Sequence, residues 1–338
     1  MKHISNKIKQ LIILISYVSN NKIVNWFTLI ISYLFPFSKL QKHLHLNPHF
    51  ISIEVTNFCN LKCPECPVGI RKNSNFKKSH FNIELYKKII DELKPTLQHI
   101  ILYFQGEPLL NKQLSEFIQY AHNSEIYTST STNGQLLTKN NAKIIIKSGL
   151  DKLIVSVDGS TQETYEKYRV GGSLEKAIEG IRNIVSQKKE LNSATPLIEI
   201  QFLVLKSNEH QILEMKLLAK ELEVDRLTFK TAQLYDFENG NELMPTINRF
   251  SRYKKIENGK YKIKNQQPNH CWRMWSGAVV NVNGEVLPCC FDKASEYSFG
   301  NVLESSFSEC WNNKKASGFR EKILQNRKQF EMCRNCTG

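Results

Sequence analysis

The chain has 338 residues, of which 41% are hydrophobic and 23% are charged. This composition is typical of a folded protein with a sizeable core, and it excludes a disordered chain, a collagen-like chain and a polytopic membrane protein. The formal net charge is +14, and ten of the 46 basic residues are Arg. Because Lys is less suited than Arg to bidentate phosphate recognition, we expect a solvated Lys surface and regard nucleic acid as the less favoured partner.

Residues 1–50 differ from the rest of the chain. They contain six Lys and no Asp, Glu or Arg, and their apolar residues fall in two stretches, 11–18 and 23–37. Neither stretch reaches the roughly 20 apolar residues of a transmembrane helix, and the first is not followed by the small-residue cleavage site of a signal peptide. We therefore expect a helical extension that packs on the body of the protein. The alternative is a basic pair of interfacial helices, within 1–45, that contacts the inner face of a membrane peripherally.

From residue 51 onward, short β-branched runs alternate with longer amphipathic stretches. The expected strands are 51–56, 99–104, 126–131, 152–157, 197–205 and 226–230. The expected helices lie near 82–94, 111–123, 138–148, 161–190 and 208–222. Six strands joined by five crossover helices predict a parallel α/β sheet that is covered on both faces. Because six units are too few for a closed eightfold barrel, we expect a partial (β/α)6, TIM-like barrel over 51–235, with reactive residues at the carboxyl ends of its strands.

The alternation stops near Tyr235. Residues 236–269 are polar and rich in Asn and Lys, which predicts a connector. Residues 270–338 contain six cysteines and a hairpin signal at 279–286, where Asn283-Gly284 suits a two-residue type I′ turn. We expect a small cysteine-bearing domain in this last segment.

The nine cysteines of the chain fall mostly in close groups, unlike those of a secreted disulfide scaffold. They are Cys59, Cys63 and Cys66; Cys271; Cys289 and Cys290; Cys310; and Cys333 and Cys336. Grouped thiols in a reducing compartment indicate metal or redox chemistry. We therefore expect a cytoplasmic protein with at least one cysteine-bound cofactor.

Cys59, Cys63 and Cys66 follow directly on the first predicted strand, at spacings of four and three residues. Three thiolates on one loop can converge on one compact site and leave a further position open for a ligand. Two other interpretations stay open at this point. Cys63 and Cys66 are spaced like a thioredoxin-type redox pair, and a structural zinc site would need a fourth ligand, for which His80 and Cys271 are distant in the sequence.

This Cys-x3-Cys-x2-Cys pattern after the first strand resembles the radical S-adenosylmethionine (SAM) superfamily. Further residues that fit this family stand at or just beyond the ends of the following strands. They are Gly106, Glu107 and Pro108; Asn133; Ser156 and Asp158; and Arg169. One departure is Glu65, which stands before the third cysteine where the family often has an aromatic residue.

The resemblance implies a 4Fe–4S cluster and a bound SAM. The implied cluster ligands are Cys59, Cys63 and Cys66. The strand-end residues would bind SAM, with Glu107 at its amino group, Ser156 at its ribose and Arg169 at its carboxylate. Reductive cleavage of SAM would then give a 5′-deoxyadenosyl radical that abstracts hydrogen from an unactivated C–H bond.

The later cysteines resemble the SPASM/twitch extension that follows many radical SAM cores. The resemblance implies one auxiliary 4Fe–4S cluster on Cys271, Cys289, Cys333 and Cys336. Four protein ligands leave no open iron, which favours electron transfer at this cluster. Cys290 could replace its neighbour as a ligand, and we expect Cys310 to belong to the core. A zinc ribbon is the alternative, although it requires two Cys-x2-Cys knuckles and one is present.

We therefore expect a radical SAM enzyme that oxidises, dehydrogenates or otherwise modifies a C–H bond in a small molecule, a peptide or an amino sugar. A flavodoxin or ferredoxin would be its reductant. Residues near the strand ends are candidates for the wall of the substrate cavity: Tyr103, Gln105, Gln201, Lys230 and Gln233. Arg273 is a candidate for binding an anionic group of the substrate. The alternatives are an RNA-modifying radical SAM enzyme and a non-catalytic iron–sulfur electron carrier.

Overall fold

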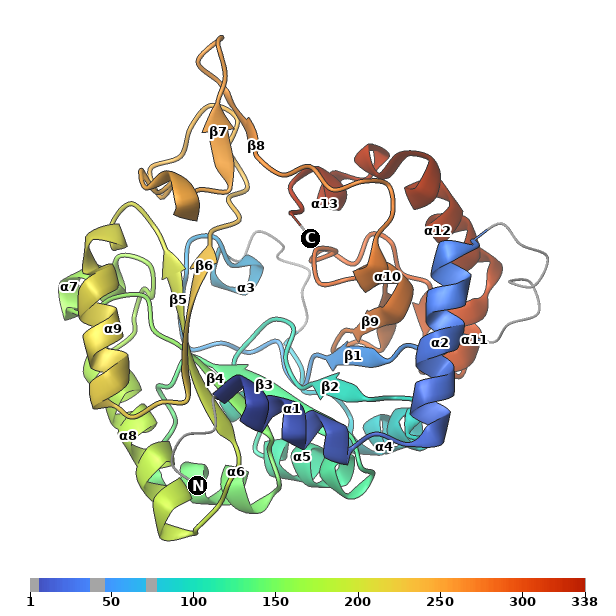
Figure 1. Ribbon diagram of the computed structural model, residues 1–338, viewed down its shortest axis with the longest axis horizontal. Coiled ribbons are helices and arrows are strands. Elements are labelled where there is room, and N and C mark those ends of the chain that lie inside the picture. Colours follow the sequence, from blue (N-terminus) through green and yellow to red (C-terminus); the bar gives the residue numbers. More distant parts are fainter. Residues whose placement is uncertain (1–5, 37–45, 71–77, 338) are drawn as a thin grey trace.

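The structure is a computed structural model that describes residues 6–36, 46–70 and 78–337. Its centre is a nine-stranded sheet in the order β11-β10-β9-β1-β2-β3-β4-β5-β6 (Figure 1). Six strands run parallel and pair in chain order: β1 (Phe50–Ile53), β2 (His99–Ile101), β3 (Tyr127–Thr132), β4 (Lys152–Ser156), β5 (Leu197–Val204) and β6 (Arg226–Thr231). The sequence predicted all six. Within the described residues, β11 and β6 lie at opposite ends of the sheet, so the barrel is partial, as expected.

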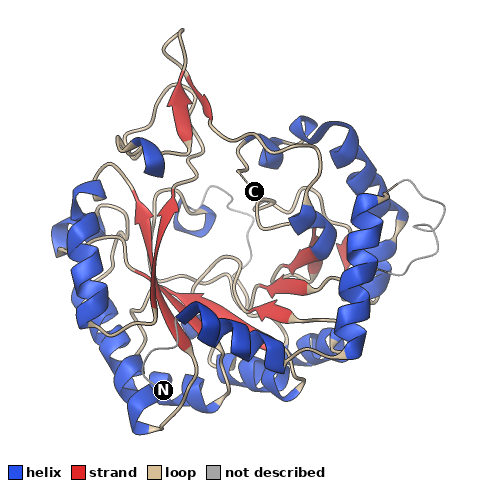
Figure 2. Ribbon diagram, viewed as in Figure 1, coloured by secondary structure: helices blue, strands red, loops and turns tan. Residues whose placement is uncertain are grey.

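The crossover helices cover the outer side of the curved sheet (Figure 2). They are α4 (Ile83–Leu93), α5 (Leu114–Asn123), α6 (Lys139–Lys147), α7 (Gln162–Glu166), α8 (Leu174–Glu190) and α9 (Ile212–Glu221). The single helix expected over 161–190 is wrong, because this stretch forms α7 and α8. Gly171 has a φ of +81° and Ser173 caps the first turn of α8 through the Lys176 amide. The chain between the two helices is therefore free to turn toward the cysteine loop.

The last segment of the chain continues the same sheet beyond β1. Strand β9 (Gly277–Val280) pairs in parallel with β1, and β10 (Glu285–Leu287) and β11 (Gly300–Asn301) follow in antiparallel. A Cβ on Gly277 would lie 2.1 Å from the Phe50 ring, so this close strand approach requires glycine. The cysteine-bearing segment thus shares its sheet with the barrel, which the sequence did not predict.

The turn between β9 and β10 differs from the expected two-residue type I′ turn. A type I′ turn needs positive φ at both Asn283 and Gly284, and Gly284 alone of the two has it, at +85°. The Asn281 amide donates to the Glu285 carbonyl at 3.1 Å, which leaves a three-residue loop between them. Three-residue hairpin loops commonly end in a left-handed glycine, so the glycine signal was real and the loop length was wrong.

The stretch expected to be a connector, 236–269, contains a short hairpin of its own. Its strands are β7 (Tyr253–Lys255) and β8 (Tyr261–Ile263). Tyr253 is buried and packs with Leu61 and Cys63 of the first cysteine loop. The connector therefore covers that loop as well as linking the two cysteine-bearing parts.

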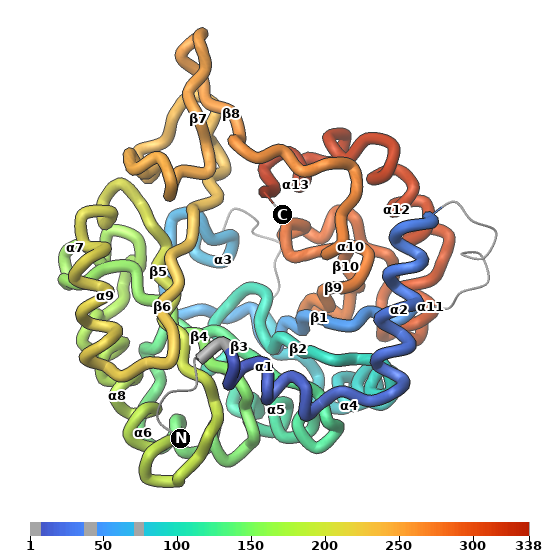
Figure 3. Tube along the Cα trace, viewed as in Figure 1, coloured from blue at the N-terminus to red at the C-terminus, as the bar shows by residue number. Residues whose placement is uncertain are grey.

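The N-terminal apolar stretches form α1 (Asn6–Ser16) and α2 (Asn20–Leu34). The end of the second predicted stretch, Phe37, lies outside the described residues. The remaining helices follow the cysteine-bearing strands or connect them: α10 (Trp272–Ser276), α11 (Phe307–Asn312), α12 (Lys314–Asn326) and α13 (Glu331–Arg334). Helix α2 packs against α10, which places the N-terminal extension beside the C-terminal cysteine-bearing segment (Figure 3). No described helix is long and apolar enough to cross a membrane.

Candidate functional site

The first cysteine site is the loop between β1 and the short helix α3 (Pro67–Ile70). The Leu61 amide donates to the Cys59 sulfur at 3.4 Å, and the Cys66 amide donates to the Cys63 carbonyl at 3.1 Å. A Cβ on Gly69 would lie 2.4 Å from that same carbonyl oxygen, so α3 packs directly on the loop. The loop is therefore shaped by its own backbone and by the helix that follows it.

The three thiols of this loop differ in exposure, since Cys63 is buried and Cys59 and Cys66 are partly buried. Burial, and to a smaller extent the nearby Glu107, Cys66 and Cys63, raise the pKa of the Cys59 thiol to about 11, although the hydrogen bond from the Leu61 amide opposes the shift. Burial likewise raises the pKa of Cys63, although Arg169 opposes the shift. Because a cluster is bound by thiolates, cluster binding must release protons from Cys59 and Cys63.

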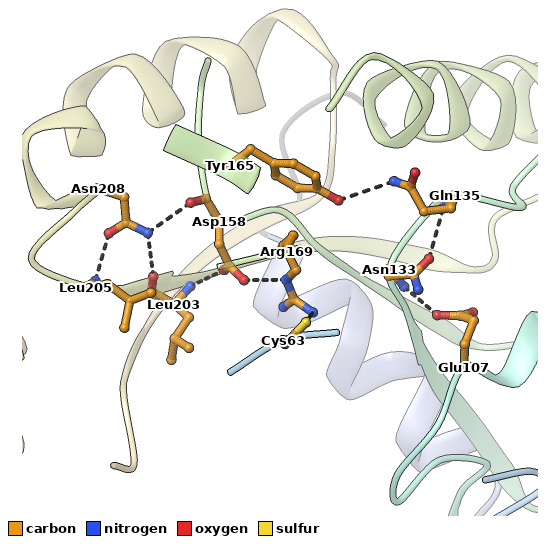
Figure 4. Close-up of polar contacts among 10 residues, drawn as sticks. All are labelled: Cys63, Glu107, Asn133, Gln135, Asp158, Tyr165, Arg169, Leu203, Leu205 and Asn208. Atoms are coloured by element: carbon orange, nitrogen blue, oxygen red, sulfur yellow. Dashed lines mark hydrogen bonds and ion pairs between the residues drawn. The ribbon is translucent and has the colours of Figure 1, made fainter. Parts of the chain in front are cut away.

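Arg169 joins the cysteine loop to the carboxyl end of β4. Its Nε donates to Asp158 Oδ2 at 2.5 Å, and its Nη1 lies 3.9 Å from the Cys63 sulfur (Figure 4). A backbone hydrogen bond of 3.0 Å from the Lys62 amide to the Val170 carbonyl lies beside these contacts. The structure therefore brings together two residues predicted to bind SAM and one predicted cluster ligand.

Asp158 is held in place from the neighbouring strand. Its second carboxylate oxygen accepts from the Leu203 amide at 2.6 Å. Asn208 Nδ2 donates to both the Asp158 and the Leu203 carbonyls at 2.9 Å (Figure 4). The Asp158 side chain has no exposed surface. Its carboxylate is thus fixed, and it orients the Arg169 guanidinium.

Glu107 forms a second buried network at the ends of β2 and β3. Its carboxylate accepts from Thr132 Oγ1 and from the Asn133 amide, each at 2.7 Å, and from the Leu109 amide at 3.2 Å. Asn133 in turn donates to Asn60 of the cysteine loop at 2.8 Å. Burial raises the pKa of Glu107, whereas the hydrogen bonds from Asn133 and Thr132 lower it. The network connects Glu107 to the cysteine loop through Asn133.

The other predicted SAM-binding residues lie around these networks. Gly106 has a φ of +74°, and a Cβ there would lie 2.4 Å from the Thr56 carbonyl oxygen, so the chain passes close to the start of the cysteine loop. Pro108 is buried and opens a short 3-10 helix. Ser156 is nearly buried at the end of β4, opposite Gln201 of β5. All the predicted residues therefore stand at or just beyond the carboxyl ends of β1 to β4.

The second cysteine site is a cavity of about 360 Å³ in the C-terminal segment. Four cysteines line it: Cys271, Cys289, Cys333 and Cys336. Burial raises the pKa of the Cys333 thiol to about 11; nearby Arg327 lowers it, and the proximity of Cys271 and Cys336 raises it. The four residues predicted as auxiliary ligands thus surround one space.

The donor sets of both sites fit iron–sulfur clusters. Within the described part of the chain, no three His, Cys, Asp or Glu side chains converge closely enough to bind a single metal ion. The irons of a 4Fe–4S cluster are each bound by a separate thiolate, so its ligands stand around the cluster and do not meet at one point. Three thiols on a loop and four around a cavity match such an arrangement.

Comparison with known families agrees with this geometry. Residues 53–216 match the sequence model of the radical SAM superfamily, and residues 271–337 match that of SPASM, an iron–sulfur cluster-binding domain. The two matches together span more than half of the chain. The chain belongs to the radical SAM superfamily. Its cofactors are accordingly SAM and 4Fe–4S clusters, one in each domain.

Two characterised relatives are distant and cover most of the chain. The tungsten-containing aldehyde ferredoxin oxidoreductase cofactor-modifying protein of Pyrococcus furiosus is 24% identical over 321 residues, which are 85% of this chain and 87% of that protein. The PqqA peptide cyclase of Bradyrhizobium diazoefficiens is 25% identical over 296 residues, which are 80% of this chain and 74% of the cyclase. At 24% and 25% identity, both relatives are distant enough from this chain for their substrates to differ from its own.

Solved structures show the same fold. Streptococcus suis SuiB bound to S-adenosylmethionine gives a TM-score of 0.63 at 16% identity, over 86% of this chain and 72% of SuiB. BtrN in complex with AdoMet and 2-DOIA gives 0.52 at 20% identity, over 87% of this chain and 95% of BtrN. The partial barrel with its C-terminal extension is therefore a known radical SAM architecture.

A second cavity, which we call the central cavity, lies inside the radical SAM barrel and has a volume of about 410 Å³. Four of the five predicted wall residues line it: Tyr103, Gln201, Lys230 and Gln233. The fifth, Gln105, is absent from this wall among the described residues, and its side chain donates to the Lys293 carbonyl at 2.9 Å. Arg273 also lines the cavity, as does Lys293, which the sequence analysis missed.

Serines on the strands also line the central cavity and were missed. Ser52 of β1 and Ser129 of β3 stand on its wall. Small hydroxyl residues in otherwise β-branched strands are the signal that could have identified them, because inward-facing positions of a fully packed barrel are usually apolar.

The two remaining cysteines, Cys290 and Cys310, lie in different parts of the structure. Cys290 lines the central cavity, where Arg273 Nη1 lies 3.0 Å from its sulfur. Cys310 is buried in the main core, as expected. Neither lines the four-cysteine cavity among its described residues.

Proposed function

We propose that this radical SAM enzyme oxidises an unactivated C–H bond of a substrate held in the central cavity. The observation that carries the proposal is a shared wall: Arg273, Cys289 and Phe291 line both the central cavity and the four-cysteine cavity. A substrate in the central cavity would be separated from the auxiliary site by one layer of side chains. Such proximity favours removal of an electron from the substrate, and thus a net oxidation.

The proposed ligands of the SAM-binding cluster are the cysteines of the first loop, Cys59, Cys63 and Cys66. Those of the auxiliary cluster are Cys271, Cys289, Cys333 and Cys336. The position of Cys290 beside Arg273, in the other cavity, supports Cys289 as the ligand of this adjacent pair. When bound, SAM and the clusters supply hydrogen-atom abstraction and electron transfer, chemistry that the side chains lack.

Arg169 is the proposed partner of the SAM carboxylate. The Arg169 Nε donates to Asp158, and the terminal Nη1 of the guanidinium lies beside the Cys63 sulfur. A guanidinium whose orientation is already fixed loses less freedom when it binds a carboxylate. Asp158 acts here as a positioning residue, because it is buried and already bonded to Leu203 and Arg169.

Glu107 is proposed to accept from the SAM amino group while it holds Asn133 in place. Its Oε1 accepts two hydrogen bonds, and its Oε2 accepts one, from the Asn133 amide. A carboxylate oxygen has two acceptor sites, so Oε2 has room for a further donor. Gly106, Pro108, Asn133 and Ser156 complete the proposed SAM-binding wall.

The charges around the central cavity favour a substrate with an anionic group. Lys230, Arg273 and Lys293 line it, and none of its described lining residues is Asp or Glu. Burial lowers the pKa of Lys293, and the nearby Cys66 and Cys290 oppose that shift. A carboxylate or phosphate on the substrate would compensate these cations and fix the orientation of the reacting C–H bond.

A peptide is the first candidate for the substrate class. The relatives and neighbours include PqqA peptide cyclases, SuiB bound to its precursor peptide and anSMEcpe bound to a peptide. BtrN, which was solved with 2-DOIA, makes a small molecule the second candidate. In either case the substrate loses a hydrogen atom, an electron and a proton, and a reductant of the flavodoxin or ferredoxin type supplies the electron that SAM cleavage consumes.

The proposal is tested by 5′-deoxyadenosine formation from SAM in anaerobically reconstituted protein with a strong reductant. A variant with Cys59, Cys63 and Cys66 all changed to Ala serves as the control. We expect the wild-type protein to form 5′-deoxyadenosine and the variant to form at least about a thousandfold less, because the variant lacks the three thiolate ligands of the cluster. Absence of product from wild-type protein that carries its full iron would support an electron carrier, and zinc in place of iron would contradict both cluster assignments.

A further inference from the structure

The N-terminal helices contact the rest of the protein through polar side chains as well as through Leu29 and Tyr33, which pack on the main core. On α2, Lys22, Asn25 and Ser32 share one face with Leu29, and all four are buried. Asn25 Nδ2 donates to the Asn47 carbonyl at 3.0 Å, and Ser32 accepts from Trp275 Nε1 at 3.1 Å. In an ordinary surface helix the inward face is apolar, so the inward face of α2, with three buried polar side chains, is unusually polar.

The outward faces of the same helices are apolar. Within the described residues, twelve of the twenty exposed large hydrophobic side chains lie between positions 8 and 35. On α2 they recur at helical spacing, as Val24 (63% exposed), Phe27 (54%), Ile31 and Leu34. Leu11 and Ile15 do the same on α1. Exposed apolar surface gathered in one place marks an interaction site.

The two N-terminal helices are attached near the amino-terminal ends of the strands, away from the first cysteine site, although Tyr33 of α2 lines the four-cysteine cavity. Gln98, just before β2, donates to the Leu14 carbonyl of α1 at 3.0 Å. Lys22 Nζ donates to the Glu125 carbonyl, just before β3, and the Tyr17 hydroxyl donates to Asp151, just before β4, at 2.9 Å. Figure 1 shows α1 lying at this end of the sheet. These polar contacts hold both helices firmly while their apolar faces stay exposed.

We propose that α1 and α2 form an interfacial docking surface for an anionic lipid membrane. Neither helix is long and apolar enough to span a membrane, whereas an apolar face with basic surroundings is typical of helices that lie in the headgroup region. The first 50 residues of the sequence carry five Lys besides the buried Lys22, and no acidic residue, and Lys attracts anionic headgroups. Docking in this way directs the amino-terminal ends of the strands to the membrane and leaves the carboxyl ends, with the SAM site, facing the opposite side.

The test is co-sedimentation of the reconstituted full-length protein with vesicles of phosphatidylcholine alone or of phosphatidylcholine with 30% phosphatidylglycerol. We expect binding to the anionic vesicles, weaker binding at high salt, and about tenfold weaker binding of the double variant Val24→Glu/Phe27→Glu. The matched control is Leu213→Glu/Leu217→Glu, two equally exposed apolar residues (64% and 62%) on α9, which should bind like wild type. Unchanged 5′-deoxyadenosine formation establishes that each variant is folded.

A milder substitution gives a second readout. Trp26 is 45% exposed on α2, and brominated lipids should quench its fluorescence, an effect that Trp26→Phe should remove. Failure of the wild-type protein to bind anionic vesicles would overturn the proposal, as would equal binding by the two double variants. A wild-type dimer in light scattering that Val24→Glu/Phe27→Glu converts to a monomer would also overturn it, because a second copy would then cover this face.

Discussion

The two cysteine sites are built in opposite ways. The first takes its three cysteines from eight consecutive residues, Cys59 to Cys66, and its shape depends on local backbone contacts and on α3. The second collects Cys271, Cys289, Cys333 and Cys336 from segments that meet only in the folded protein. A ligand set made by one loop survives distant changes, whereas a set made by the tertiary fold is coupled to folding. The second site should therefore respond to changes that leave the first intact.

The largest expected effect comes from a single substitution that should remove the second cluster and leave the first in place. Cys289→Ala should lower the iron content from about eight to about four per chain, because a 4Fe–4S cluster requires its thiolate ligands. Oxidation of the substrate should be lost, while 5′-deoxyadenosine formation stays within a few-fold of wild type. Iron analysis and product assay of the anaerobic protein provide the measurement.

Its neighbour supplies the control, since Cys290 lines the central cavity and contacts Arg273. Cys290→Ala should keep its full iron. A loss of iron from Cys290→Ala and not from Cys289→Ala would reverse the ligand assignment.

The next effect concerns the first site and its buried ion pair. Asp158→Asn removes the charge that pairs with Arg169 and should lower the free energy of unfolding by about 3 kcal/mol, because it leaves a largely buried guanidinium unpaired. It should also raise the KM for SAM. Urea unfolding and steady-state SAM cleavage measure the two effects.

A surface pair gives the comparison for Asp158→Asn. Glu221 and Arg182 form an exposed ion pair at 3.0 Å, so Glu221→Gln should change stability by less than about 0.5 kcal/mol. Equal losses from the two variants would show that the Asp158–Arg169 pair is no more important than a surface pair.

The smallest expected effect tests the contact between the barrel and the C-terminal cysteine-bearing segment. Glu54, just after β1, is buried and accepts from the Val282 amide at 2.9 Å, and burial raises its pKa to about 7. The Glu54 carboxyl therefore has a higher pKa in the folded protein than in the unfolded chain. Its contribution to the free energy of unfolding falls as the pH rises toward 7 and becomes constant at higher pH. Relative to Glu54→Gln, wild type should lose about 1 kcal/mol between pH 6 and pH 8 in urea unfolding. Parallel pH profiles of stability for the two proteins would contradict the raised pKa of Glu54.

The contrast between local and tertiary signals also explains what the sequence could predict. Alternating β-branched and amphipathic runs predicted all six parallel strands, and the resemblance to radical SAM and SPASM sequences implied which cysteines would lie together. The break between α7 and α8 was missed because the apolar periodicity continues across it, although Gly171 and Gly172 were the available signal. The pairing of β9 with β1 leaves no local signal, since its partners are far apart in the chain. For the same reason, the sequence could not predict that Lys293 faces the same cavity as Lys230.

The β1–β9 pairing also has a consequence for how the chain is made. Until the ribosome has released residues beyond Gly277, one edge of β1 has no partner strand, because Phe50 to Ile53 pair there with Gly277 to Val280. Unpaired strand edges attract other chains, and pairing between distant segments forms slowly. The nascent barrel should therefore depend on chaperones until its last strands emerge, and a shortened chain that ends before β9 should aggregate.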